Sequence, residues 1–410
     1  MMKRGNVGLL VLFVVYTLNY LDRSLVYILF EPIRQELELT DLGLALLGST
    51  SFVLFYTTLG VPFGRLSDRV SRTKLIAAGL AVWSLASAGT GLAGGFLALL
   101  ACRVLVGVGE ATLGPAAYSL LADWFPPSRR GTASALFAAG IPVGAGIAMI
   151  AGGWMGQHFG WRATFPMLSL PGLVIALAVL MLPEPERGAR EKPVAASSPW
   201  SLLLRNKALL LTIVGYAAVA VASNAAGMWI PKLLSARYER GIGEVGLWVG
   251  ICAVAGGLLG TALGGWLSDR LERRMLGGRL VFGATVGVLG AGAWALLLVA
   301  PSLPVALFGC FAILALGLAW LGAASADVQD AVPAMHRATA ISVYTLVVNV
   351  IGLGIGAPAV GALSDALGLQ SALWLCPVAS LAGAAVLAVA AVVRMGSVGT
   401  VDEVEPITAK

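Results

Sequence analysis

Charged residues are scarce in this chain of 410 residues, where Asp, Glu, Lys and Arg together make up only 12%. A soluble domain usually carries about a quarter charged residues, which cover its surface. Apolar residues make up 58% of the chain and its mean hydropathy is +0.89, so a water-soluble fold is excluded. Intrinsic disorder is excluded as well, because disordered chains have low hydrophobicity.

Cysteine and histidine are also rare, with four and two residues. Four cysteines in a chain of this length exclude a disulfide-stabilised secreted scaffold, and their apolar surroundings identify them as small buried hydrophobic residues. His158 and His336 are isolated, and no group of histidine, cysteine and carboxylate residues has the spacing of metal ligands. We therefore expect neither a metal nor another cofactor. The sequence also lacks the phosphate-binding loop of ATPases, which argues against ATP-driven transport.

Apolar runs of about 20 residues fill most of the chain, and a helix of that length crosses the ~30 Å hydrocarbon core of a bilayer. The predicted fold is an all-α membrane protein with twelve transmembrane helices. These helices are expected over residues 7–30, 42–64, 75–94, 96–121, 131–156, 163–182, 208–234, 245–267, 280–300, 303–326, 338–362 and 369–393. The first run follows Lys3 and Arg4 as in a signal peptide, but no small-residue cleavage site follows it, so we expect it to be retained.

The basic residues are unevenly distributed between the two sides of these helices. Of the 27 Lys and Arg residues, 20 fall on the side of the termini and 5 on the other side. This asymmetry is the positive-inside bias, so both termini are predicted to be cytoplasmic. It also accounts for the net charge of +6 without nucleic-acid binding. The high Ala and Gly content suggests a bacterial source, and hence the plasma (inner) membrane.

Two short sequence repeats and one polar connection divide the chain. Residues 64–69 (GRLSDR) are echoed by residues 265–270 (GWLSDR), and residues 123–133 by residues 330–340. Each copy lies at a helix end on the predicted cytoplasmic side. The polar segment 183–207 reads as a cytoplasmic linker. We expect two six-helix pseudo-repeats around a central cavity, with bundles at 1–182 and 208–394 and a cytoplasmic tail at 395–410.

Several of these segments resemble one family of membrane proteins. Residues 64–74 (GRLSDRVSRTK) and 103–111 (RVLVGVGEA) resemble signatures of the major facilitator superfamily. The segments NYLDR, EPIR, ADWFPP, GIPVG and GWRA in the first half resemble its spinster-like branch, including bacterial members. The resemblance implies the major facilitator fold, no enzymatic activity, and secondary transport by alternating access, with lysolipids or sphingoid phosphates as the substrates of relatives. A related anion-symporter branch also has a segment like NYLDR.

Four ionisable residues lie inside the predicted helices of the first half: Asp22, Arg23, Arg103 and Glu110. A charge near the bilayer centre costs ~2.5–3.5 kcal/mol on insertion scales, which marks these positions as functional candidates. Helix rise places Asp22, Arg23 and Glu110 in one layer near the midplane. Because arginine stays protonated, Asp22 as the main site and Glu110 as the second are the candidate proton carriers, with Arg103 as a coupling partner. The alternative is a permanent cluster of salt bridges that fixes two helices together.

Polar and aromatic residues near the same depth are the candidate substrate contacts. They are Arg23, which suits an anionic head group, and Asn19, Tyr20, Tyr27, Tyr118, Asn224, Trp229, Trp320 and Asn349. For the four residues of the second half the alternative is a role in helix packing, and Asn224 and Asn349 are the stronger candidates because a buried amide needs a partner. Charge in the first half and an apolar second half suit an amphipathic anion. We therefore expect a proton-coupled transporter of a lysolipid-like substrate that acts as a monomer among membrane lipids. The alternatives are a small organic-anion or drug transporter and, from another class, a membrane enzyme acting on lipids, for which no nucleophile with a base is visible.

A cytoplasmic gate is predicted from the repeated charged segments. Its residues are Gly64, Asp68, Arg69, Arg72, Arg129, Asp269, Arg270 and Arg337. We expect Asp68 to face the positive N-terminal end of the eleventh helix near Arg337, and Asp269 to face the fifth helix near Arg129. Such contacts would hold one access state and break in the other. The alternative is that these charges serve only to orient the chain in the membrane.

Overall fold

A computed structural model describes residues 2–185, 206–333 and 336–399 of the chain. All regular structure in these described ranges is helical, as predicted. Most of the predicted linker and residues 400–410 of the predicted tail lie outside them.

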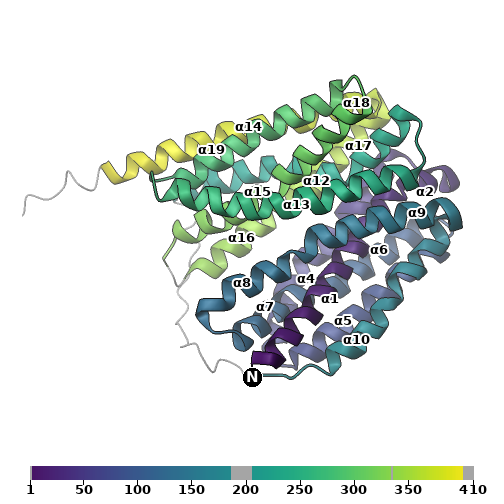
Figure 1. The fold of residues 1–410 in the computed structure, drawn as a ribbon, viewed down its shortest axis with the longest axis horizontal. Coiled ribbons are helices and arrows are strands. Elements are labelled where there is room, and N and C mark those ends of the chain that lie inside the picture. Colours follow the sequence, from purple (N-terminus) through teal and green to yellow (C-terminus); the bar gives the residue numbers. More distant parts are fainter. Residues whose placement is uncertain (1, 186–205, 334–335, 400–410) are drawn as a thin grey trace, which may run out of the picture.

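The helices form two groups that follow one another along the sequence (Figure 1). The first group holds α1 (Met2–Ile28), α2 (Phe30–Leu37), α3 (Asp41–Ala45), η1 (Leu46–Thr50), α4 (Ser51–Ser67), α5 (Arg72–Gly89), η2 (Thr90–Leu92), α6 (Phe96–Glu110), α7 (Leu113–Trp124), α8 (Pro127–Ala138), α9 (Gly140–Ser169) and α10 (Pro171–Leu180). The second group holds α12 (Lys207–Tyr238), α13 (Ile242–Glu272), α14 (Gly278–Val299), α15 (Leu303–Asp330), α16 (Arg337–Asn349), η4 (Val350–Ile355), α17 (Gly356–Leu367), α18 (Leu369–Ala372) and α19 (Leu375–Gly399).

The described residues contain 11 helical segments that are long and apolar enough to cross a membrane. One of them, residues 128–180, has 53 residues, about twice the length that one crossing needs. Gly160 interrupts it with a left-handed backbone (φ 78°), so the chain turns there and crosses twice. The structure therefore agrees with the twelve predicted crossings, and the protein is an all-helical, multi-pass membrane protein.

The fourth predicted helix is one membrane span, Phe96–Trp124, but its helical hydrogen bonding is interrupted in the middle, which was not expected from the sequence. Helix α6 ends at Glu110, residues 111–112 form a turn, and α7 begins at Leu113. Pro115 explains the break, because a proline has no N–H to donate to the carbonyl four residues back and its ring clashes with that carbonyl at Ala111. The break places Glu110 at a helix end in the interior of the protein.

The internal repeat is visible in the backbone as well as in the sequence. Glu38 and Glu239 are separated by the same offset as the two LSDR segments, and both adopt a left-handed conformation with φ 51°.

A separate contact joins the two groups beside the cavity. The second and eleventh crossings, which are not copies of each other in the repeat, each contain a π-helical segment, η1 and η4, and these two segments pack against each other. Thr50 of η1 donates a hydrogen bond of 3.0 Å to the carbonyl of Gly354 in η4.

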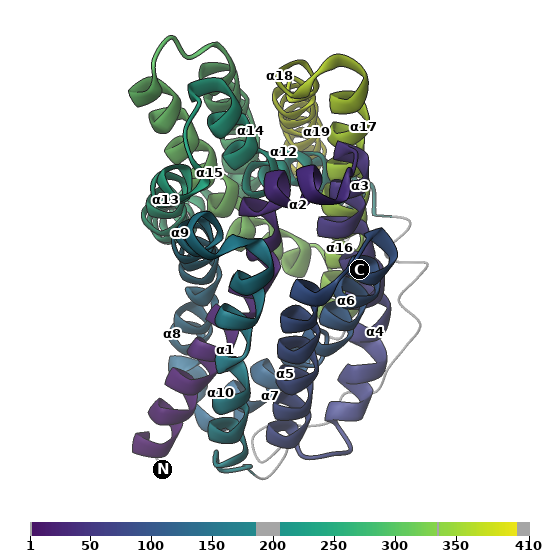
Figure 2. The same cartoon turned by 90° about the vertical axis from the view of Figure 1, so that its right-hand side faces the viewer.

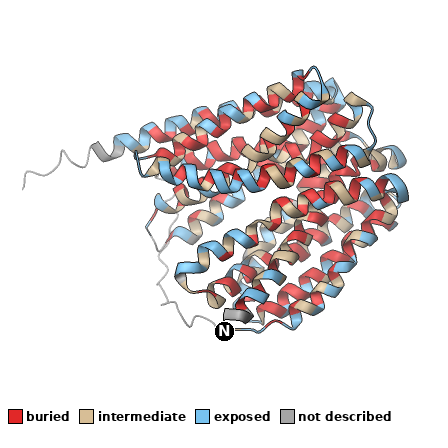
Figure 3. Cartoon of the chain, in the orientation of Figure 1, coloured by how far each residue is buried: buried red, intermediate tan, exposed pale blue. Residues whose placement is uncertain are grey.

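The two groups meet at one end of the molecule. The start of α1 and the end of α19 lie at the other end, which we call the terminal face (Figure 1). At the opposite face, α3 packs against α17, and α9 runs along α13 (Figure 2). Buried residues concentrate inside each group and where the groups meet, whereas exposed ones lie on the outside (Figure 3). Large apolar side chains such as Trp154 and Phe308 are exposed on this outer surface, as suits contact with lipid.

Candidate functional site

A cavity of about 260 Å³ lies between the two groups of helices. Its lining comes from α1 and α9 of the first group and from α12, α13, α15, α16 and η4 of the second. The lining is mostly apolar, and among the lining residues Arg23 is the one that carries a formal charge. An apolar chamber with a few polar groups is the usual form of a small-molecule site.

Arg23 and Glu110 form an ion pair at the edge of this cavity. Arg23 Nη2 lies 2.8 Å from Glu110 Oε2, and the side chain of Arg23 is 15% exposed whereas that of Glu110 is fully buried. The rings of Tyr20 and Tyr56 lie 4.7 Å and 5.2 Å from the guanidinium carbon of Arg23. Glu110 Oε1 has no hydrogen-bond partner among the described residues. One carboxylate oxygen is therefore held by arginine and the other is buried without compensation, a costly arrangement for a permanent charge.

Asp22 faces away from the cavity, into the first group of helices. Its Oδ1 accepts hydrogen bonds from Ser87 (2.8 Å) and Ser169, and the residue is 1% exposed. Arg103 lies beside it and donates to the carbonyl of Asp22 (3.4 Å) and to Thr90 Oγ1 (3.0 Å). The four intramembrane charges thus form two layers: Arg23 with Glu110 next to the cavity, and Asp22 with Arg103 behind them.

Six of the nine candidate substrate contacts line the cavity. They are Arg23, Tyr20, Tyr27, Asn224, Trp320 and Asn349. The other three lie elsewhere among the described residues. Asn19 is buried next to the cavity and accepts a hydrogen bond of 3.5 Å from Arg23. Tyr118 is half exposed and packs edge-on against Phe137, whereas Trp229 is buried in the apolar core against Phe30.

Several residues of the site were not singled out from the sequence. Ser87 and Ser169 hold Asp22, and Tyr56 packs on Arg23. Ser and Tyr are common in membrane helices, so neither residue type marks a position as functional. The one available signal was the position of Ser87 in the third helix at a depth similar to that of Asp22.

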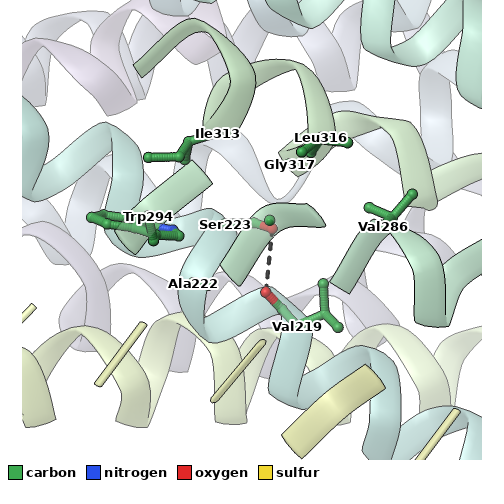
Figure 4. Close-up of a pocket in the computed structure, with 9 residues that line it drawn as sticks. Val219, Ala222, Ser223, Val286, Trp294, Ile313, Leu316 and Gly317 are labelled. Carbon is green, nitrogen blue, oxygen red and sulfur yellow. Dashed lines mark hydrogen bonds between the residues drawn. The ribbon is translucent and has the colours of Figure 1, made fainter. Parts of the chain in front are cut away.

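The second group supplies a mostly apolar wall in which Trp320 and Ser223 are joined by hydrogen bonds. Trp320 Nε1 donates to Ser223 Oγ (3.2 Å), and the Trp320 ring stacks on Tyr216. Ser223 in turn donates to the carbonyl of Val219 (Figure 4). Behind this wall lies a small pocket of about 10 Å³, the lower limit for one water molecule, so it is no separate ligand site.

The predicted gate residues lie at the terminal face, but the ion pairs described there stay within one group. Asp269 pairs with Arg279 (3.1 Å) of its own group, and Arg337 donates to the carbonyl of Gln329 (3.1 Å). Asp68 is exposed. In this arrangement the two groups are thus separate at the terminal face, and the predicted contacts of Asp68 and Asp269 across the halves remain predictions for another access state.

The remaining gate residues divide between exposed and buried positions. Arg69, Arg129 and Arg270 are exposed, whereas Gly64 is half-buried. Arg72 is 1% exposed and binds Asp123 (2.5 Å) and Glu184 (2.8 Å).

The repeat extends to the ion pair of Arg72 and Asp123, although its second copy is more exposed. Arg72 and Asp123 recur as Arg279 and Asp330, which lie 2.6 Å apart. Glu184 follows the sixth crossing, and partial burial opposes its ionisation, but hydrogen bonds from Arg72, Thr73 and Ser71 outweigh this effect and lower its pKa from 4.5 to about 2. Each bundle therefore has a structural ion pair at the terminal face.

These features define a class of protein. Twelve crossings in two related groups, with a cavity between them and ionised residues at its edge, are the layout of a secondary transporter. The sequence profile of the Major Facilitator Superfamily matches residues 12–289 and 242–403 of the chain. The chain therefore belongs to the Major Facilitator Superfamily, and it is a secondary transporter rather than an enzyme.

Known proteins and solved structures narrow the similarity to spinster-like transporters and efflux pumps. An MFS-type efflux pump of Mycolicibacterium smegmatis is 30% identical over 89% of this chain and 86% of its own length. Protein spinster homolog 1 of Rattus norvegicus is 33% identical over 66% of this chain, which spans 56% of that protein. The crystal structure of a bacterial homologue of the human lysosomal transporter spinster, inward-facing and unoccupied, superposes with a TM-score of 0.81 at 25% identity over the whole of both chains.

Proposed function

We propose that the chain is a proton-coupled transporter of a lysolipid-like or other amphipathic anion across the bacterial plasma membrane. Both termini lie in the cytoplasm in this proposal. The cavity is then open toward the cytoplasm, which is the inward-facing state.

The observation that carries the proposal is the position of Arg23 at the edge of a mostly apolar cavity, where it is the one charged residue of the lining. A guanidinium is a good partner for a phosphate or carboxylate, because its planar donors match those groups. The wall opposite, with Ile313, Leu314 and Leu318, suits an apolar chain. An amphipathic anion satisfies both surfaces at once.

The coupling is proposed to run through the same arginine. Glu110 and an anionic substrate would compete for Arg23, since both offer oxygen acceptors to one guanidinium. When substrate takes Arg23, Glu110 loses its counter-charge inside the protein, and neutralisation by a proton then relieves the burial cost. Asp22, the main proton carrier expected from the sequence, lies beside Arg103 and is proposed to take up a proton when the helices around Ser87 and Ser169 shift.

The proposal is tested by flux measurements in proteoliposomes of purified protein. A labelled lysophospholipid is followed with and without an imposed pH gradient, for the wild type, Glu110→Gln and Asp22→Asn. We expect gradient-driven flux in the wild type, loss of this flux in both variants, and retained exchange in Asp22→Asn. Glu244→Gln is the control. Glu244 forms an exposed ion pair with Arg240, 3.6 Å away, and it is far from Glu110 and Asp22 along the chain.

Two outcomes would count against the proposal. Gradient dependence that is unchanged in both Glu110→Gln and Asp22→Asn would remove proton coupling. Flux of lysolipid no faster than in empty liposomes would remove the substrate class. The second candidate is export of a small organic anion or drug, which the efflux pump of M. smegmatis favours, and the same liposomes loaded with such compounds would test it.

A further inference from the structure

A cluster of charged and polar residues joins the two groups of helices at the opposite face. We call it the opposite-face latch, and its residues are Glu31, Asp41, Lys232, Ser364 and Asp365. Glu31 and Asp41 come from α2 and α3 of the first group. Lys232 comes from α12, and Ser364 and Asp365 from α17, of the second group. None of these residues belongs to the cavity lining.

The contacts within the latch cross between the groups in both directions. Lys232 Nζ donates to Asp41 Oδ1 and lies 3.7 Å from Glu31 Oε2. Ser364 Oγ donates to Asp41 Oδ2 at 2.6 Å. The Asp365 carboxylate accepts hydrogen bonds from the backbone N–H groups of Asp41 (2.8 Å) and Leu42 (3.0 Å). Both oxygens of Asp41 and both oxygens of Asp365 are thus used in holding α3 to the second group.

The backbones are close enough at this point to leave little water between them. A Cβ atom added to Gly361 of α17 would lie 2.8 Å from the carbonyl oxygen of Asp41, so only glycine allows this approach. The side chains of Lys232 and Asp41 are 12% and 10% exposed. An ion pair at this degree of burial is screened less by salt and solvent than an exposed pair.

The balance of charge makes Lys232 the central residue. Three carboxylates, those of Glu31, Asp41 and Asp365, approach this junction, and Lys232 contacts two of them. Arg34 also binds Glu31, at 2.8 Å, and lowers the pKa of that carboxyl, so Glu31 remains charged. Without the lysine, the carboxylate of Asp41 would lie buried among acidic neighbours, and the two groups would repel each other at this face.

We propose that the pair of Lys232 and Asp41 sets the population of the state that is open at the terminal face. Alternating access requires the groups to separate at the opposite face, and the pair must then break and be solvated. On the terminal face, by contrast, the described ion pairs of Arg72, Arg279 and Arg394 join helices of one group and do not oppose separation there. This asymmetry favours the arrangement seen here. The proposal requires only alternating access and is independent of the substrate and of proton coupling.

The test measures access to the cavity rather than transport. Asn349, which lines the cavity, is replaced by cysteine, and a membrane-impermeant maleimide is added from the side of the opposite face. We expect Lys232→Gln and Asp41→Asn each to increase the labelling rate about fivefold or more, in the range of a typical coupling free energy. The double variant Lys232→Asp with Asp41→Lys should restore slow labelling, because it re-forms the pair with reversed charges.

Two further variants keep the test decisive. Glu244→Gln breaks the exposed pair with Arg240 within the second group, and labelling should stay at the wild-type rate. A reducible bis-methanethiosulfonate cross-link between Lys232→Cys and Asp41→Cys, applied from the opposite face, spans the length of the lysine side chain that a direct disulfide would not. It should block labelling from the opposite face and leave labelling from the terminal face intact, until a reductant is added. If the single variants keep the wild-type melting temperature and the wild-type labelling rate, or if the charge-reversed pair labels as fast as the single variants, the proposal is wrong.

Discussion

At the scale of the residue, the four charged side chains inside the first group of helices each contact a polar or charged partner. Arg23 binds Glu110, Arg103 binds the backbone of Asp22, and Asp22 binds two serine hydroxyls. The burial cost of the charges was readable from the sequence, since no apolar helix would keep them without a reason. The partners were not readable, because Ser87 and Ser169 are separated from Asp22 by 65 and 147 residues along the chain.

A first prediction concerns Glu184, whose low pKa reflects its bonds with Arg72, Thr73 and Ser71. A carboxyl with a pKa lowered from 4.5 to about 2 on folding stabilises the folded state above pH 4.5, and this contribution is lost as the pH falls toward 2. We expect Glu184→Gln to lower the unfolding free energy by about 1 kcal/mol near pH 7. The measurement is thermal unfolding of both proteins in detergent from pH 7 to pH 3. If the difference in melting temperature between the wild type and Glu184→Gln grew toward low pH, this prediction would be wrong.

At the scale of the element, the breaks in the helices matter as much as the helices. The apolar run over residues 96–121 predicts one continuous helix, whereas in the structure α6 ends at Glu110 and α7 starts at Leu113. Pro115 was visible in the sequence, but prolines also occur inside membrane helices that remain continuous, as Pro231 does in α12. Whether a proline interrupts a membrane helix or leaves it continuous depends on the neighbouring helices. They can supply a hydrogen-bond donor to the carbonyl four residues before the proline, or fail to do so.

A second prediction follows from this break. Pro115→Ala restores an N–H that can bond to the carbonyl of Ala111, so the helix can continue past Glu110 and turn its carboxylate away from Arg23. We expect the thermal stability to be unchanged or higher and the rate of substrate flux in proteoliposomes to fall about tenfold or more. Pro171→Ala is the control, since Pro171 is the first residue of α10, where no helical bond is lost. Equal flux in both variants would show that the break has no role.

A third prediction concerns the close packing of α9 against α13. A Cβ atom at Gly246 of α13 would lie 2.2 Å from the carbonyl oxygen of Met149 in α9, so the helices must move apart in Gly246→Ala. We expect a loss of ~1–3 kcal/mol of stability, as for other overpacked positions, measured as a lower melting temperature. Gly265→Ala on the same helix is the matched control, because nothing lies within 4 Å of its added Cβ. A loss of similar size in both variants would contradict the packing argument.

At the scale of the whole molecule, the two groups of helices meet at one face and separate at the other. The cavity lies between them, and hydrogen bonds from Thr50 to Gly354 and from Lys232 to Asp41 join the two groups. A further contact there runs from the N–H of Gly243 to Gln157 Oε1, at 2.9 Å. The resulting shape resembles that of the inward-facing bacterial spinster homologue.

A fourth prediction tests this overall arrangement. In a variant with Cys102→Ser and Cys252→Ser, a single added cysteine at Asn349 should react with an impermeant maleimide from the terminal face at least about ten times faster than from the opposite face. The other two cysteines, Cys310 and Cys376, are fully buried and should stay unmodified. The comparison uses right-side-out and inside-out vesicles. Equal rates from both sides would mean that the state described here is not the main one in the membrane.

The sequence by itself determined the class of the protein, its membrane crossings and the identity of its costly internal charges. These properties follow from local composition, because the bilayer imposes the same length and polarity rule on every helix. The tertiary structure alone decided that Arg23 faces the cavity with Glu110, that Asp22 turns away from it, and that Lys232 holds Asp41 across the groups. Those choices depend on the direction of each side chain and the packing of helices far apart in the chain, and no local pattern encodes either of them.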